Sequence, residues 1–248
     1  MTEYYDEKIS AGSYDMNTWL RGGYDKGIIT TIYGPAGSGK TNICLLVAVS
    51  QAGKGKKVIF IDTEGGFSSD RARQIIGKEK TKEEIEEVLK NILILKPTNF
   101  EEQKKSMERL LEEIKNPESI GAIIVDGMTM LYRLELGEKG TGKPGDEIIT
   151  KEENIRSVNQ ELVKQMRTLA EIARKKNLAV IVTNQVYKKE EMTKLVGGDI
   201  LQYWSKCLIE LVNDNSRRKA VLTKHRSMKE STLPFYITDK GIKKRGWI

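Results

Sequence analysis

The chain has 248 residues, a length that suits a single α/β domain over residues 1–248. Its 42 basic and 35 acidic residues leave a net charge of +7, which permits nucleic-acid binding without requiring it. Two cysteines and one histidine are too few for a disulfide framework or a histidine-based metal site. No apolar run approaches the length of a membrane span, and the polar N-terminus lacks a signal-peptide pattern. We therefore expect a cytoplasmic protein with no membrane partner.

As far as residue 126 the chain alternates helical patterns with short apolar runs. The runs are continuously apolar, which is typical of parallel strands covered on both faces. The predicted elements are, in order, a helix over Tyr14–Leu20, a strand over Gly27–Tyr33, a helix around Ile43–Val49, a strand over Val58–Asp62, helices over Ser68–Ile76 and Thr81–Leu89, a strand over Asn91–Pro97, a helix over Phe100–Lys115 and a strand over Ala122–Asp126.

Two polar stretches that we interpret as loops follow. Arg133–Thr150 contains four glycines, and a loop of that length inside a compact domain is usually functional. The second stretch, Val186–Val196, is shorter and rich in lysine. Between and after the loops the pattern predicts a long helix over Lys151–Lys175, a strand over Leu178–Thr183 and a short helix over Gly198–Lys206.

The pattern changes at the C-terminal end, where three strands follow one another without helices. They cover Cys207–Val212, Lys219–Lys224 and Leu233–Thr238. The sequence therefore predicts an α/β fold with a mainly parallel central sheet, flanking helices and antiparallel strands added at one edge.

The most specific motif is Gly34-Pro35-Ala36-Gly37-Ser38-Gly39-Lys40-Thr41, which fits the phosphate-binding loop pattern between a strand and a helix. Glycines let the backbone turn and approach a phosphate closely, and successive N–H groups bind the anion at the helix start. Lys40 is expected to reach the β- and γ-phosphates, and the Thr41 hydroxyl to ligate Mg²⁺. The alternative is a glycine turn with an incidental lysine. We include the next residue, Asn42, among the nucleotide-binding candidates.

Polar residues end three other predicted strands at the edge where ligands bind in such sheets. Asp126 is expected to hold Mg²⁺ through water. Glu64 is the candidate general base that orients water for attack on the γ-phosphate. Gln185 offers a neutral amide that could sense the γ-phosphate. The alternative for each residue is a polar strand end or a surface side chain.

Several segments occur in the order and rough spacing of RecA-type recombinases, and the whole chain from about Ile9 to Ile248 resembles their P-loop ATPase core. The matching segments are Gly34–Thr41, Ile61–Phe67, Ile124–Gly127, Val182–Val186 and Gly197–Ile200. The resemblance implies a RecA-like fold that binds ATP and Mg²⁺. It also implies that Glu64 is catalytic and that Gln185 couples the nucleotide to two DNA-binding loops, after Arg133 and after Gln185. Arg71 matches an arginine that packs on adenine.

Other segments resemble the archaeal paralogues of these recombinases. They are Tyr33–Pro35 with Gly39–Ile43, Gly197–Leu201 with Trp204–Lys206, and Lys224–Ser227. Full recombinases carry an N-terminal DNA-binding domain and a Phe-x-x-Ala segment that docks on the neighbouring subunit. Here about 26 residues precede the first core strand and none spells that segment. The resemblance therefore implies an accessory or mediator in DNA repair and homologous recombination, with weak DNA-dependent ATPase activity and without robust strand exchange.

The expected partners are single-stranded or branched DNA, the main recombinase and other recombination or replication proteins, and association with further copies of the chain is a further option. Phosphate contacts could come from Lys54, Lys56, Lys57, Lys188, Lys189, Lys194, Arg217, Arg218 and Lys219, although an ordinary solvated surface is the alternative. Two other functions share the phosphate loop. One is a KaiC-like regulatory ATPase that acts on protein partners, and the other is a non-hydrolysing module that ATP switches.

The segment Lys224-His225-Arg226 ends a predicted strand far along the chain from the phosphate loop. Because side chains alternate along a strand, we expect Lys224 and Arg226 to point one way and His225 the other. In the geometry of the family, this edge faces the nucleotide of a neighbouring subunit. Lys224 and Arg226 could then contact its γ-phosphate in trans, as an arginine finger does. The alternative is a solvated basic turn.

Overall fold

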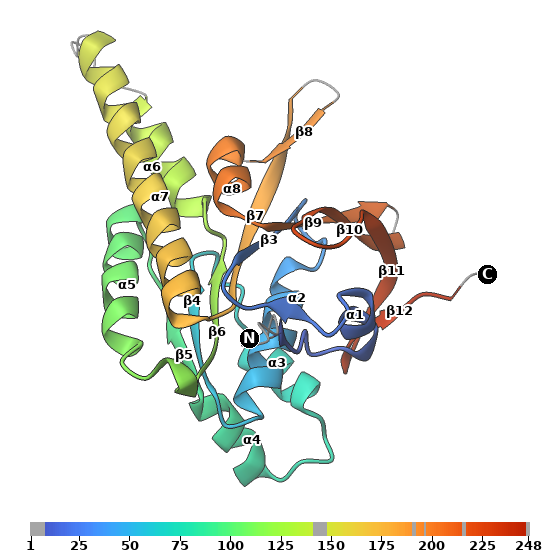
Figure 1. Cartoon of the computed structure of the whole chain (residues 1–248). Coiled ribbons are helices and arrows are strands. Elements are labelled where there is room, and N and C mark those ends of the chain that lie inside the picture. Colours follow the sequence, from blue (N-terminus) through green and yellow to red (C-terminus); the bar gives the residue numbers. More distant parts are fainter. Residues whose placement is uncertain (1–7, 141–147, 190–191, 196, 215–216, 247–248) are drawn as a thin grey trace, which may run out of the picture.

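A computed structural model describes residues 8–140, 148–189, 192–195, 197–214 and 217–246 (Figure 1). Within these ranges one large sheet has the strand order β12-β11-β10-β9-β3-β7-β6-β4-β5, and β8 pairs with β7 outside this path. The strands are β3 Ile29–Gly34, β4 Lys57–Asp62, β5 Ile92–Leu95, β6 Ile120–Asp126, β7 Val180–Lys189, β8 Met192–Leu195, β9 Cys207–Asp214, β10 Arg217–His225, β11 Ser231–Thr238 and β12 Gly241–Lys244. A separate pair joins β1 Lys8–Ile9 to β2 Tyr24–Asp25.

The strands from β9 to β5 run parallel, whereas β9 to β12 pair antiparallel to one another. This confirms the predicted sheet and its antiparallel C-terminal extension. β12 and the β1–β2 pair were not predicted, because two to four residues carry too short a pattern to be distinguished from turns.

Helices cover both faces of the parallel strands (Figure 1). The helices are α1 Tyr14–Trp19, α2 Lys40–Ala52, α3 Ser69–Ile76, α4 Lys82–Lys90, α5 Phe100–Glu113, α6 Met130–Gly140, α7 Ile148–Lys176 and α8 Gly198–Trp204, with a 3₁₀ turn over Pro117–Ser119. Neighbouring residues of a strand point to opposite faces, so Phe60 packs with α2 while Ile61 packs with α5 and α7. Continuous apolar runs are therefore needed to fill two cores. None of the helices within the described ranges has the length and apolar character needed to cross a membrane.

The prediction of a loop over Arg133–Thr150 is wrong for most of its length. The chain is helical in α6 up to Gly140, and α7 begins at Ile148; residues 141–147 lie outside the described residues. Leu131 and Tyr132, at the start of α6, are buried in the core. Their burial stabilises a helix that the glycines alone would disfavour, since packing overrides local propensity.

The prediction of a loop over Val186–Val196 is also wrong. β7 continues to Lys189 and pairs antiparallel with β8, with Val186 opposite Leu195; residues 190–191 and 196 lie outside the described residues. Pairing with β8 satisfies backbone groups that a lone polar segment would leave to water. The hairpin projects beyond the body of the sheet (Figure 1).

Candidate functional site

The phosphate loop lies between the end of β3 at Gly34 and the start of α2 at Lys40. A Cβ on Gly34 would lie 2.4 Å from the Leu211 carbonyl oxygen, so only glycine fits there. Gly37 and Gly39 have φ angles of 72° and 109°, in the left-handed region that favours glycine. The glycines of the motif thus serve backbone conformation and close packing, as the pattern predicts.

The interior of the loop suits an anion. Ser38 is buried, and its Oγ has no hydrogen-bond partner among the described residues. Lys40 is only 6% exposed, and its Nζ donates to the carbonyl oxygens of Gly34 and Pro35, both at 2.9 Å. Burial lowers the pKa of Lys40, while the negative charges of Glu64 and Asp126 act in the opposite direction. A buried ammonium that has only carbonyl partners, beside an unsatisfied hydroxyl, is a set of donors that a phosphate can satisfy.

The predicted magnesium ligands lie in direct contact. Thr41 Oγ1 donates to Asp126 Oδ2 at 2.7 Å, and Thr183 Oγ1 donates to Asp126 Oδ1 at 2.5 Å. Gly66 faces this pair, and a Cβ there would lie 3.1 Å from Thr41 Oγ1. A hydroxyl and a carboxylate beside an anion cradle fit Mg²⁺, which takes oxygen ligands and commonly shares them with substrate phosphates and water.

Asp126 is 1% exposed, and burial raises its pKa. The charges of Glu64 and Asp62 add to this rise, whereas the hydrogen bonds from Thr183 and Thr41 oppose it. The carboxylate is therefore held in an environment that disfavours its charge. A bound cation would relieve this cost, because an opposite charge nearby favours the ionised form.

The side chains of Glu64 and Gln185 are also in contact. Gln185 Nε2 donates to Glu64 Oε2 at 3.1 Å. The turn that carries Glu64 is fixed by Asp62, whose two carboxylate oxygens accept from the N–H groups of Gly66 and Phe67, each at 3.0 Å. Glu64 and Gln185 line a cavity of about 440 Å³ together with Thr129 and the α6 residues Met130, Arg133, Leu134 and Gly137.

Arg71 lies beside the first turn of α2. Its Nε donates to Asn42 Oδ1 at 2.9 Å, and its terminal nitrogens donate to the carbonyl oxygens of Thr238 and Asp239. The guanidinium is thus held in a fixed plane between α2 and the turn that joins β11 to β12. The structure brings the two predicted nucleotide contacts, Arg71 and Asn42, together next to the phosphate loop.

Lys224 and Arg226 lie away from the phosphate loop of their own chain. His225, at the end of β10, is opposite Cys207, and Cys207 is in turn opposite Thr30 at the start of β3. The phosphate loop follows the other end of β3. Lys224 Nζ donates to the Gln202 carbonyl oxygen at 2.7 Å. Burial lowers the pKa of Lys224, and the charge of Lys206 lowers it further.

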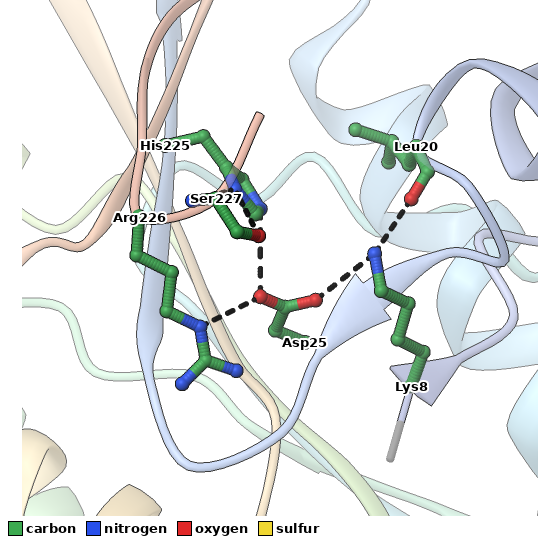
Figure 2. A network of polar contacts seen from close by, with 6 residues as sticks. All are labelled: Lys8, Leu20, Asp25, His225, Arg226 and Ser227. Atoms are coloured by element: carbon green, nitrogen blue, oxygen red, sulfur yellow. Dashed lines mark hydrogen bonds and ion pairs between the residues drawn. The ribbon is translucent and has the colours of Figure 1, made fainter. Parts of the chain in front are cut away.

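Arg226 does not follow the expected alternation, because β10 ends at His225. Arg226 Nε donates to Asp25 Oδ2 at 3.0 Å, and His225 Nε2 lies 3.4 Å from the same oxygen (Figure 2). The expectation that His225 and Arg226 point in opposite directions is therefore wrong.

Three supporting residues of the site escaped the sequence analysis. Asp62 holds the Glu64 turn and Thr183 holds Asp126. Asp62 ends β4 and Thr183 follows the apolar run at the start of β7, and a polar residue directly after an apolar run is a signal that could have identified both. Arg218 was counted only as a DNA phosphate contact. Its NH2 group lies 3.4 Å from the Gly37 carbonyl oxygen, and no sequence pattern indicates this approach to the phosphate loop.

Comparison with known proteins agrees with this geometry. The profile of the Rad51 family matches residues 7–245. The chain is 43% identical to the DNA repair and recombination protein RadB of Methanococcus maripaludis, covering 90% of this chain and 94% of that protein. It is 38% identical to the same-named protein of Methanobrevibacter smithii, covering 96% of each. A solved structure described as the RadB recombinase is similar with a TM-score of 0.74 and 32% identity, over 96% of this chain and 100% of the other. The chain belongs to the Rad51 family and, within it, to the RadB group of DNA repair and recombination proteins.

Proposed function

We propose that this protein binds ATP with Mg²⁺ at the phosphate loop and hydrolyses ATP slowly. Two contacts carry the proposal. Thr41 donates a hydrogen bond to Asp126, and Gln185 donates one to Glu64, both where the parallel part of the central sheet ends. A phosphate-binding loop, two magnesium ligands and a carboxylate aligned with an amide are the parts that γ-phosphate hydrolysis requires.

Each residue has a physical role in this proposal. Lys40 exchanges its two carbonyl partners for the β- and γ-phosphates, and the backbone N–H groups between Gly34 and Thr41 hold the remaining phosphate oxygens. Mg²⁺ supplies charge neutralisation on the phosphates, with Thr41 and Asp126 as its protein partners. Glu64 accepts a proton from the attacking water. Arg71 stacks its fixed guanidinium plane on the adenine.

Slow, DNA-dependent turnover is supported by the contact between Gln185 and Glu64. The Gln185 amide occupies one oxygen of the proposed base, so Glu64 is not fully available to water. Gln185 belongs to β7, which continues into the β7–β8 hairpin. DNA that displaces this hairpin would draw Gln185 away from Glu64. The hairpin carries Lys188, Lys189 and Lys194, which are candidates for phosphate contacts.

We further propose a role as an accessory or mediator in homologous recombination, acting on single-stranded or branched DNA together with the main recombinase. Support comes from relatives named as DNA repair and recombination proteins.

Lys224 and Arg226 are proposed to contact the nucleotide of a second copy, since they lie near the end of β3 that is opposite their own phosphate loop. A head-to-tail association would bring these opposite ends together.

Phosphate release and DNA binding, measured on the same preparation, test the proposal. The parent protein should bind DNA at low salt and release phosphate faster with DNA than without it. A Lys40→Ala variant serves as the control for contaminating ATPase. DNA binding without phosphate release would favour the non-hydrolysing module. Phosphate release without DNA binding would favour the regulatory ATPase that acts on protein partners.

A further inference from the structure

A buried carboxylate joins a segment near the N-terminus to a segment near the C-terminus. Asp25, on β2, is 3% exposed and receives contacts on both oxygens (Figure 2). Lys8 Nζ lies 3.1 Å from Oδ1, while Arg226 Nε donates to Oδ2 at 3.0 Å. Asp25 thus connects β1, at the N-terminal side, to the segment that follows β10, 201 residues later. A buried carboxylate is stable only when it is paired, so these contacts hold its neighbours firmly.

The other donors around Asp25 are anchored elsewhere. Lys8 Nζ also donates to the Leu20 carbonyl oxygen at 2.7 Å. His225 Nδ1 accepts from the Ser227 N–H at 3.1 Å, which leaves the ring proton on Nε2, the nitrogen that faces Asp25. The side chain of His225 is 3% exposed, whereas that of Arg226 is 34% exposed. Arg226 therefore reaches the surface, whereas His225 does not.

The geometry fixes the direction of the Arg226 guanidinium. Its Nε is turned inward to Asp25, and Figure 2 shows the two terminal nitrogens pointing away from that carboxylate. A guanidinium is planar, so a bond at Nε determines where the terminal nitrogens lie. Holding a flexible cation in one direction before its ligand arrives lowers the ordering cost of the contact.

We propose that Asp25 is a positioning residue that holds Arg226 ready for the triphosphate of an ATP molecule bound to a second copy of this chain. This inference rests on the trans contact stated under the proposed function and assigns the residue that prepares it. It also couples β2 to the intersubunit contact, since Asp25 belongs to that strand.

The test compares ATP turnover at saturating ATP over a range of protein concentrations. Arg226→Ala should lower turnover about 10-fold or more, in keeping with the removal of a finger-type cation. Asp25→Asn should lower turnover to a similar extent while calorimetric ATP affinity stays at the parental value. The double variant Asp25→Asn/Arg226→Ala should be no slower than Arg226→Ala alone, because Asp25 acts only through Arg226.

Arg226→Lys provides a second route if Asp25→Asn does not fold. It keeps the positive charge but has no Nε donor, so it should lose turnover as Arg226→Ala does. Lys8→Ala is the matched control, since it removes a cation from the other oxygen of Asp25 and leaves the Arg226 bond; its turnover should remain parental.

Two results would overturn the inference in distinguishable ways. Parental turnover in both Asp25→Asn and Arg226→Lys, beside a slow Arg226→Ala, would reject the positioning role and leave the trans contact standing. Parental turnover in Arg226→Ala would reject the trans contact itself, and the positioning role with it. Multiplicative losses in the double variant would show that Asp25 acts independently of Arg226, which also rejects the inference.

Discussion

Gln185 donates a hydrogen bond from its side-chain amide to the carboxylate of Glu64 at 3.1 Å, although 121 residues separate the two in the chain. Glu64 follows β4, and Gln185 lies within β7 where that strand leaves the parallel part of the sheet for the hairpin with β8. A proposed catalytic group is thus connected by one side-chain contact to a segment that projects from the protein. The first two predictions concern this contact.

Replacing Glu64 by Gln should separate ATP binding from ATP hydrolysis. The amide keeps the size and polarity of the side chain but cannot accept the proton, so we expect turnover to fall about 100-fold or more with little change in affinity. Single-turnover phosphate release and calorimetry would measure the two quantities. Equal turnover in variant and parent would show that Glu64 is not the base.

Replacing Gln185 by Ala should remove the coupling between DNA and turnover. Without the amide, Glu64 loses its partner whether or not DNA is present, so we expect the ratio of DNA-stimulated to basal phosphate release to approach one. The measurement is phosphate release over a DNA titration. DNA affinity at low salt acts as the control, since it should change little. A parental stimulation ratio would contradict the proposed coupling.

Replacing Lys40 by Ala should weaken ATP binding. The variant loses a charge-assisted contact to the phosphates, for which we expect a loss of about 10- to 100-fold in affinity. Lys40→Arg keeps the charge and is the matched comparison, although its fork has a different shape. Thermal unfolding of both variants checks that the loop survives the loss of the bonds to Gly34 and Pro35. Unchanged ATP affinity in a folded Lys40→Ala variant would defeat the assignment.

Replacing Asp126 by Asn should stabilise the nucleotide-free protein while weakening Mg²⁺-dependent ATP binding. Burial raises the pKa of Asp126 in the folded state, so folding favours its neutral form. The contribution of this group to stability is therefore present at low pH and is lost as the pH rises through the raised pKa. Asn does not ionise, and at pH 7 we expect a gain of about 1 kcal/mol in the free energy of unfolding.

Chemical denaturation of the Asp126→Asn variant at pH 7 and at pH 4 would check this sign. The gain should shrink at the lower pH, where the carboxyl of the parent becomes neutral. A variant that is less stable than the parent at pH 7 would show that the hydrogen bonds from Thr41 and Thr183 outweigh the cost of burial.

DNA binding should be electrostatic and weakly selective for sequence. The chain carries a net charge of +7 and only 6% aromatic residues, so phosphate contacts should contribute more than base stacking. We expect the affinity for single-stranded DNA to fall at least about 10-fold between 50 and 200 mM salt, as several lysine–phosphate contacts would require. Fluorescence anisotropy would measure it. A flat salt response would favour a protein partner instead.

The sequence by itself determined the phosphate loop, the strand end that carries Asp126, and the change from parallel to antiparallel strands. These features are local. Glycines at fixed spacing allow the backbone conformations of the loop, and strands buried on both faces require continuous apolar runs. Only the tertiary structure decided that 133–140 is helical and that 186–189 is a strand, because Leu131 and Tyr132 are buried by distant segments and Val186 pairs with Leu195. It alone also joined Asp25 to Arg226, since a contact across 201 residues depends on how the sheet is assembled and leaves no periodic trace in the chain.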